Sequence, residues 1–459
     1  MVTVRALLGL ILLGYFGLAL GYALATPRWN NPDEPAHFNY IREIAESGRL
    51  PVIGSGDWDA ELLERLKTAR FPDDAAIREI RYEAHQPPLY YLLAAPLYHL
   101  SGAFGLSAQI LALKGLSVLL GALVVVATFV AAHLIFSDRP AIAVLAAATA
   151  AFIPMHTAIS AAINNDSLAN ALAAVTVAAL AFGLRRGFDD RATVALGMLL
   201  GALLLTKLTV YLYVPLAVGA LLWAERQRLH AHKPVSPMTV WRRPLLALAV
   251  AAAVAAWWFV RNALTYGWTD PLAAMRHDEI VVGQPRWERF DMAAGDYLLR
   301  VLFRSFWGQF GWMGVVLDER LYLLYLVVTL LGLGGLLLLL YERIRPSPGP
   351  GHAASSALSA RGEPGQRLAV GLLVAATMLA IGQVLAYNSR FIQPQGRYLF
   401  PALAPISLLL SLGWWRLAHL TAQRRQDPST GHRLLFALGA GLGALDLVCL
   451  LVFVAPAFR

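Results

Sequence analysis

The chain has 459 residues, of which 58% are hydrophobic and only 15% are charged, and its mean hydropathy is +0.56. This composition excludes an ordinary soluble globular protein and indicates an integral membrane protein, because a soluble domain cannot bury so much apolar surface. Basic residues at the ends of apolar runs explain the net charge of +9, so we expect no nucleic acid partner, and the single Cys449 excludes intrachain disulfides and a cysteine-based metal site.

Apolar runs recur along the whole chain. A helix needs about 20 apolar residues to cross a bilayer, and the pattern predicts an all-α membrane protein with about 11 transmembrane helices. The first run resembles a signal peptide, with Ala23-Leu24-Ala25 as a cleavage site, but its length favours an uncleaved span. The predicted spans are residues 6–25, 108–136, 140–160, 167–184, 192–206, 209–224, 244–260, 321–341, 368–386, 398–415 and 434–454.

The short basic loops all fall on one side of this threading. They include Arg185-Arg186, Arg242-Arg243 and Arg424-Arg425, and the positive-inside rule makes that side, with the N-terminus, cytoplasmic. The composition indicates a bacterial plasma membrane. We expect a catalytic module, residues 1–262 with an extracytoplasmic loop 26–107, and a C-terminal module, residues 263–459 with extracytoplasmic loops 263–320 and 387–397 and a cytoplasmic linker 342–367.

The first outer loop opens with an acidic pair, Asp33-Glu34. Asp33 can cap an amphipathic helix that Gly48 ends, and such a helix can lie along the membrane surface. Capping alone would explain Asp33 in an ordinary protein. The position of the pair directly after the first span, facing a second polar cluster, favours a functional role.

That second cluster is Glu83-Ala84-His85-Gln86, which precedes Pro87-Pro88. The apolar stretch 89–100 that follows is too short to span, so we expect a juxtamembrane helix in the interface. His85 and Gln86 could bind a phosphate or a sugar hydroxyl, or they could form an exposed loop.

Two further polar groups lie at the same side of the membrane. Asn165 or Asp166 can cap the span that follows, and the helix start would favour an anionic group. Lys207 lies at the outer end of a short span, where snorkelling and phosphate binding are both adequate explanations.

The late outer loop contains Arg390 and Arg397, which depart from the positive-inside bias. Arginine binds phosphate oxygens through a planar fork, and Gly396 would let a ligand approach the backbone. We therefore predict phosphate or substrate binding by this loop, through Arg390, Gln395, Arg397 and Tyr398. The aromatic run from Ser305 to Trp312 could pack in the interface or stack on a sugar ring.

Taken together, these motifs resemble the GT-C superfamily of polyprenyl-phosphate-sugar-dependent glycosyltransferases, which includes protein O-mannosyltransferases and aminoarabinose transferases. The resemblance rests on Asp33-Glu34, on the stretch from His85 to Tyr90, on Asn165-Asp166 and Lys207, and on the run from Gln395 to Tyr398. Each motif is weak alone, and their order and common side carry the likeness, which is to a bacterial branch of the clan.

The resemblance implies that Asp33 acts as the base or orients the acceptor, with Glu34 as the other candidate. Some members have a basic residue directly before the proline pair, where this chain has Gln86 after His85. Some relatives place a divalent metal near the acidic loop, for which Glu34, His37 and His85 are the candidates here. No other cofactor is implied.

The hypothesis from the sequence is transfer of a sugar from a polyprenyl phosphate to an acceptor hydroxyl outside the cytoplasm, with inversion. The acceptor could be a glycan, a lipid or a protein. Three alternatives stay open: a transporter or flippase for lipid-linked sugars, favoured by His133 and Asp446 inside predicted spans, a ligase or polymerase that uses lipid diphosphates, and a non-catalytic scaffold.

Overall fold

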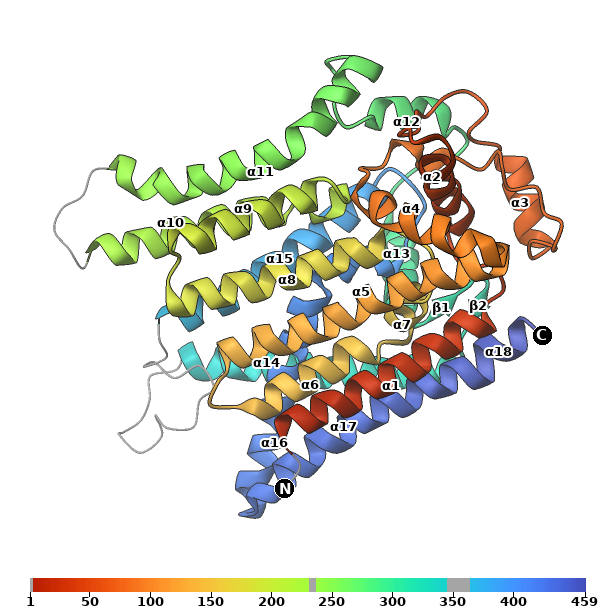
Figure 1. Ribbon diagram of the computed structural model, residues 1–459. Coiled ribbons are helices and arrows are strands. Elements are labelled where there is room, and N and C mark those ends of the chain that lie inside the picture. The colour runs from red at the N-terminus through yellow and green to blue at the C-terminus, as the bar shows by residue number, and fades with distance from the viewer. Residues whose placement is uncertain (1–2, 231–236, 345–363) are drawn as a thin grey trace.

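The computed structural model describes residues 3–230, 237–344 and 364–459, and this part of the chain is almost entirely helical (Figure 1). The α-helices are α1 (Val4–Ala25), α2 (Glu34–Ser47), α3 (Ala60–Thr68), α4 (Leu89–Ser101), α5 (Leu106–Ile135), α6 (Pro140–Ala151), α7 (Pro154–Ser160), α8 (Asp166–Arg186), α9 (Asp190–Leu204), α10 (Tyr213–His230), α11 (Pro237–Tyr266), α12 (Ala274–Ile280), α13 (Met292–Trp307), α14 (Glu319–Ile344), α15 (Pro364–Asn388), α16 (Leu403–Arg425), α17 (Pro428–Val448) and α18 (Ala455–Ala457). Short 3-10 turns are η1 (Tyr82–His85), η2 (Gly102–Phe104), η3 (Leu208–Val210) and η4 (Gly396–Ala402), while η5 (Cys449–Val454) is a π-helical turn; β1 (Gln309–Phe310) and β2 (Val315–Val316) pair antiparallel.

The predicted fold class, an all-α membrane protein, is confirmed. Nine described helices are long and apolar enough to cross a membrane, and the bent pair α6 and α7 makes a tenth. Every predicted span has a helical counterpart. The count falls short of eleven because α9 has only 15 residues, which would cross the hydrocarbon only where it is locally thin.

The break between α6 and α7 was not predicted from the sequence. The two helices meet at a bend of 62°, where one straight span over residues 140–160 is predicted. Pro154 lies at the start of α7, and because proline has no N–H and clashes with the preceding turn, the helix stops before it. The bend turns α7 toward the start of α8, where the site lies.

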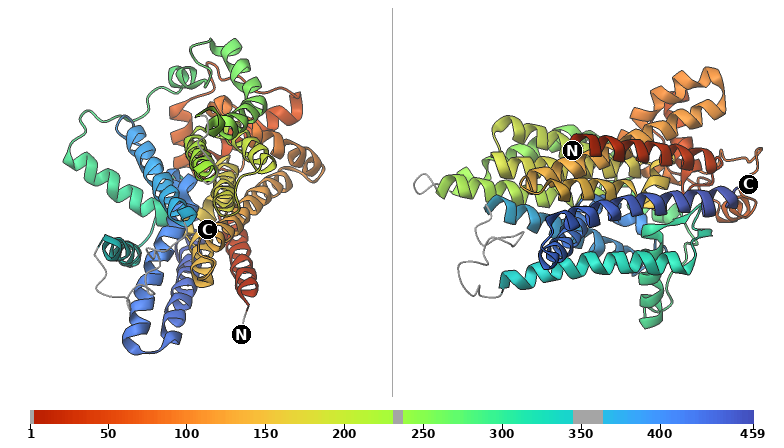
Figure 2. Two further views of the ribbon diagram at one scale, coloured as in Figure 1. Left: turned by 90° about the vertical axis from the view of Figure 1, so that its left-hand side faces the viewer. Right: turned by 90° about the horizontal axis from the view of Figure 1, so that it is seen from below.

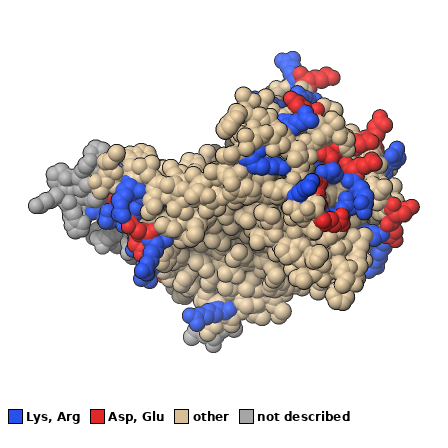
Figure 3. Space-filling view, turned by 45° about the horizontal axis from the view of Figure 1, so that its top comes forward, with Lys and Arg blue, Asp and Glu red and all other residues tan. Residues whose placement is uncertain are grey.

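The spans lie side by side in one bundle, and the two chain termini lie at opposite ends of it (Figures 1 and 2). Charged side chains gather toward the ends and leave a broad uncharged band on the face shown in Figure 3. The helices α2, α3, α4 and α12 lie together beyond the spans at one end, which we call the loop end. The predicted linker 342–367 lies mostly outside the described residues.

The amphipathic helix predicted after the first span is α2. Gly48 ends it in the left-handed conformation, with φ of 67°, as expected. Asp33 stands at the N-cap position, but its side chain makes no capping hydrogen bond, and its own φ is 65°. The capping explanation of Asp33 is therefore wrong, and the carboxylate is used elsewhere.

Asp446, an acidic residue inside a span, joins three helices. Its carboxylate accepts hydrogen bonds from the hydroxyls of Tyr22 on α1 and Thr157 on α7, each at 2.8 Å. It therefore makes helix–helix hydrogen bonds within the packed interior. His133, in contrast, lies exposed in the last turn of α5.

Glycines permit the close crossing of α14 and α16. A Cβ added at Gly413 would overlap the carbonyl oxygen of Gly332, and one at Gly335 would overlap the backbone of Gly413. Small residues at such crossings let membrane helices approach closely enough for backbone van der Waals contact.

We expect Gly413→Ala to lower the unfolding temperature in detergent, because overpacking a tight crossing typically costs about 1–3 kcal/mol. The control is Gly441→Ala, in α17, where an added Cβ meets nothing within 4 Å. Alanine there should leave stability equal or slightly higher. Equal unfolding temperatures for both variants in tryptophan fluorescence melts would contradict the crossing.

Candidate active site

Four charged side chains from distant parts of the chain meet at the loop end. Asp33 precedes α2, Asp166 begins α8, Lys207 follows α9, and Arg397 lies in η4. Arg397 pairs with Asp33 and lies 3.4 Å from Asp166, and Lys207 lies 2.6 Å from Asp166. The sequence placed all four at one side of the membrane, and the fold brings them into a single cluster.

The side chain of Asp33 has two partners, and neither of them lies on α2. Its carboxylate accepts a hydrogen bond of 2.8 Å from the hydroxyl of Tyr82 and pairs with the guanidinium of Arg397. Burial would raise the pKa of Asp33, but the charge of Arg397 and the hydrogen bonds from Arg397 and Tyr82 outweigh it and lower the pKa to about 2. Asp33 is therefore ionised at neutral pH.

Arg397 is only 4% exposed, and each of its three nitrogens has a partner. Nε donates to the side-chain oxygen of Gln395 at 2.6 Å, which fixes the plane of the guanidinium. The sequence had suggested that the adjacent Gly396 lets a ligand approach the backbone, but the structure gives this glycine another role. Its N–H donates to Ser305 at 2.7 Å, and a Cβ there would overlap the backbone of Phe306, so the glycine lets η4 pack directly on α13.

Asn165 and Gln86 line the side of the cluster that holds Lys207. The ammonium of Lys207 donates to the side-chain oxygen of Asn165 at 3.1 Å, besides pairing with Asp166. Asn165 in turn donates to the side-chain oxygen of Gln86 at 3.3 Å. Asp166 is thus engaged with cations, and Asn165 makes no capping bond; the N–H of Ser167 in the first turn of α8 donates to the side-chain oxygen of Asn164 at 3.0 Å.

A second group, Asp33, His37 and Glu83, could hold a divalent cation. One ligand atom from each lies within 4.8 Å of the others. Burial lowers the pKa of His37, which keeps the imidazole neutral, as a metal ligand must be, and Tyr91 fixes its Nδ1 at 2.9 Å. One oxygen of Glu83 is buried without a hydrogen-bond partner in the described part of the chain. The fit is partial, because Asp33 already pairs with Arg397.

Glu34 lies outside both groups. It is completely buried, and its carboxylate accepts hydrogen bonds from the backbone N–H of Trp29 at 2.9 Å and of Ile163 at 3.2 Å. Lys114 lies 3.9 Å away. Glu34 therefore ties the start of the first loop to the segment between α7 and α8, and this geometry does not support the expected catalytic or metal-binding role.

Glu34→Gln should lower the unfolding temperature, because its amide would face two buried N–H donors, and an unsatisfied buried donor costs about 1–3 kcal/mol. Glu46→Gln, at an exposed position of the same helix, is the matched control and should change stability little. If Glu34→Gln kept full stability while losing activity, the structural assignment would be wrong.

The remaining predicted site residues lie at or beyond the edge of the cluster. His85 bonds to the backbone oxygen of Tyr82 at 3.0 Å and its ring lies 4.3 Å from that of His277; burial lowers its pKa to about 3. Tyr398 lies under the guanidinium of Arg397, with 5.5 Å to the ring centre.

Arg390 is exposed, and the described contacts do not join its side chain to the cluster. The predicted phosphate-binding role of Arg390 therefore lacks geometric support.

The aromatic run that begins in the last turn of α13 packs against other parts of the protein. Trp307 is 1% exposed and stacks on Tyr325 at 4.5 Å, and the indole N–H of Trp312 donates to the backbone oxygen of Trp29 at 2.9 Å. This favours the packing interpretation of the run over sugar stacking.

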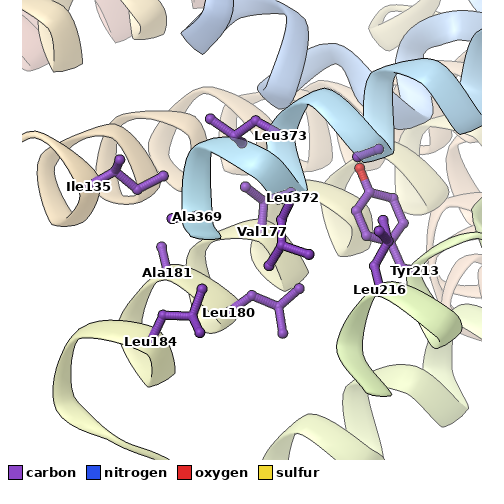
Figure 4. A pocket seen from close by; sticks show the side chains of 11 residues that line it. Ile135, Val177, Leu180, Ala181, Leu184, Tyr213, Leu216, Ala369, Leu372 and Leu373 are labelled. Atoms are coloured by element: carbon purple, nitrogen blue, oxygen red, sulfur yellow. The ribbon is translucent and has the colours of Figure 1, made fainter. Parts of the chain in front are cut away.

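A small apolar groove lies between α5, α8, α10 and α15 (Figure 4), and it reaches Ile135 and Leu184 at the ends of α5 and α8 that lie away from the cluster. Its space between atoms, about 300 Å³, is partly open to the surroundings. At one end, Tyr213 donates a hydrogen bond of 2.7 Å to the backbone oxygen of Pro401, four residues after Arg397 in η4. The lining residues are Ile135, Val177, Leu180, Ala181, Leu184, Tyr213, Leu216, Ala369, Leu372, Leu373 and Ala376.

Sequence reasoning missed Tyr82 and the position of Glu83. Glu83 belongs to the polar cluster that the sequence pattern singled out, and Tyr82 directly precedes that cluster, but neither residue had been assigned a role. The spacing of residues does not reveal a hydrogen bond from a tyrosine hydroxyl to a carboxylate in another segment.

Comparisons with known proteins place this geometry in context. The family model described as "Predicted membrane protein (DUF2142)" matches residues 67–406, and no curated protein matches the sequence. ArnT from Cupriavidus metallidurans in the apo state superposes on 98% of this chain and 73% of its own, with a TM-score of 0.50 and 17% identity. This likeness shows a fold shared with ArnT, in agreement with the resemblance predicted from the sequence.

Two other structures are similar at a lower score. ArnT from the same organism bound to undecaprenyl phosphate matches 98% of this chain and 74% of its own, with 15% identity and a TM-score of 0.49. The Archaeoglobus fulgidus oligosaccharyltransferase in the apo form matches 97% of this chain at 13% identity and a TM-score of 0.49, and this chain covers 56% of that longer protein.

Proposed function

The chain belongs to the DUF2142 family of predicted membrane proteins, and we propose that it is a glycosyltransferase that moves a sugar from a polyprenyl phosphate to an acceptor hydroxyl. The observation that carries this proposal is the meeting of Asp33, Asp166, Lys207 and Arg397 in one largely buried cluster at the loop end. Transfer from a lipid-linked sugar phosphate needs cations for the phosphate and a base for the acceptor, and the cluster supplies both.

The leaving group is stabilised by the two cations. As the bond between the anomeric carbon and the phosphate oxygen breaks, its electron pair passes to the lipid phosphate, which gains negative charge. Arg397 and Lys207 lie in a largely buried site, where fixed positive charges stabilise developing negative charge more strongly than in water. Gln395 holds the guanidinium plane, so this stabilisation needs little reorganisation.

Asp33 is the base. It takes the proton of the acceptor hydroxyl as that oxygen bonds to the anomeric carbon, and a single displacement of this kind inverts the centre. General base assistance is typically worth about 10²–10⁴-fold in rate. Tyr82 holds the carboxylate in place through its hydrogen bond of 2.8 Å. A divalent cation held by Asp33, His37 and Glu83 would add Lewis acidity beside the phosphate.

Residues 1–262 supply Asp33, Asp166 and Lys207, while residues 263–459 supply Arg397, so both proposed modules contribute to one site.

The proposed setting is the bacterial plasma membrane, with the loop end outside the cytoplasm, as the basic residues at the opposite end favour. The partners there are the donor, membrane lipids and an acceptor on a glycan, a lipid or a protein. A nucleotide is not required by this chemistry.

The test is a transfer assay. Protein in lipid is incubated with radiolabelled polyprenyl-phosphate sugars and an envelope extract, with and without Mn²⁺. We expect transfer or slow donor hydrolysis by the wild type and a loss of about 10²-fold or more in Asp33→Asn, because the base is removed. Asp74→Asn, an exposed carboxylate in the same loop, should retain the wild-type rate.

Two results would overturn the proposal. Turnover with lipid diphosphates alone would make the protein a ligase or polymerase. Movement of lipid-linked sugars across vesicles without transfer would make it a transporter.

A further inference from the structure

Both cations of the cluster are already paired with carboxylates in the free protein. Arg397 contacts Asp33 through Nη2 and Asp166 through Nη1, and Lys207 lies 2.6 Å from Asp166. The formal charges of these four groups cancel. Three of the five guanidinium N–H groups of Arg397 already donate, both Nη atoms face carboxylates, and the side chain is only 4% exposed, so a phosphate that reaches the guanidinium competes with a carboxylate for it.

We propose that Asp33 occupies the phosphate position on Arg397 in the free enzyme, and that the donor phosphate displaces it, so that donor binding releases the base. This inference rests on the proposed function and adds to it an order of events. The carboxylate becomes available to the acceptor hydroxyl only after the donor is in place.

Asp33 is the partner that yields, rather than Asp166. The side chain of Asp33 is 21% exposed against 10% for Asp166, so it borders the space from which a ligand arrives. Asp166 is additionally held by Lys207, whereas the other partner of Asp33 is the neutral hydroxyl of Tyr82. Breaking one ion pair therefore frees Asp33, while freeing Asp166 requires breaking two.

The backbone at Asp33 also favours a change of partner. A non-glycine residue at φ of 65° is strained, and the helix N-cap that it occupies lacks a side-chain hydrogen bond. A carboxylate at this position has the N–H of Ala36, in the first turn of α2, as an alternative partner; Pro35 has no N–H, and that of Glu34 already donates to Asn31. The displaced Asp33 is thus not left as an isolated buried charge.

Competition of this kind is reciprocal. If the phosphate weakens the pairing of Asp33 with Arg397, the pairing must weaken phosphate binding by the same factor. Removal of the carboxylate should then strengthen binding of a lipid phosphate, although it abolishes transfer. Charge repulsion between a carboxylate and a nearby phosphate would change affinity in the same direction, and the double-mutant cycle below separates it from competition.

The experiment measures binding of farnesyl phosphate to the full-length protein in detergent, with farnesol as the uncharged control for the tail. We expect Asp33→Asn to bind farnesyl phosphate at least about tenfold more tightly than the wild type. The reason is that binding to the variant no longer breaks the charged hydrogen bond between Arg397 and Asp33. Farnesol affinity should not change. Asp74→Asn controls for the loss of a distant negative charge.

A double-mutant cycle assigns the effect to the pair. In an Arg397→Gln background the gain from Asp33→Asn should vanish, since the competition runs through the guanidinium. If Asp33→Asn does not fold, Asp33→Ser removes the same charge with a smaller side chain.

The outcomes separate the two proposals. The displacement is overturned if the wild type binds farnesyl phosphate and Asp33→Asn binds it equally or more weakly. It is also overturned if the gain in affinity persists without Arg397. Either result leaves the glycosyltransferase proposal standing. Failure of the wild type and every variant to bind farnesyl phosphate overturns both.

Discussion

The ion pair between Arg397 and Asp33 joins residues 364 positions apart, and the geometry of the loop end depends on it. It connects η4, near the last spans, to the start of α2, directly after the first span. Buried charges are tolerated only when paired, so each of these segments needs the other. Asp166 and Lys207 extend the same requirement to α8 and the end of α9, which makes the cluster both a structural junction and the candidate reaction centre.

The supporting contacts around this pair are of a different kind. Glu34 and Asp446 are fully buried and accept hydrogen bonds from backbone or hydroxyl donors, which fix the first loop and α7 relative to the bundle. Neither faces the cluster. Two adjacent acidic residues, Asp33 and Glu34, thus have separate tasks, because successive positions at the start of a helix point in different directions.

The position of the cluster bears on the kind of ligand it can take. Arg397 lies in η4, directly before α16, and Asp166 begins α8, so the charged groups lie where membrane spans begin. The proposed donor, with an anionic head and an apolar tail, suits this position. The likeness to ArnT concerns the arrangement of helices, at 17% sequence identity.

The sequence by itself determined the membrane class, the approximate spans, α2 with its end at Gly48, and the side on which Asp33, Asp166, Lys207 and Arg397 lie, because hydropathy and charge at the ends of spans are local properties. Only the tertiary structure decided which of these residues touch. It separated Asp33 from Glu34, left Arg390 exposed, brought in Tyr82, and assigned Gly396 to helix packing. Such pairings depend on how distant helices pack, and residue spacing along one chain does not encode the distance between two spans.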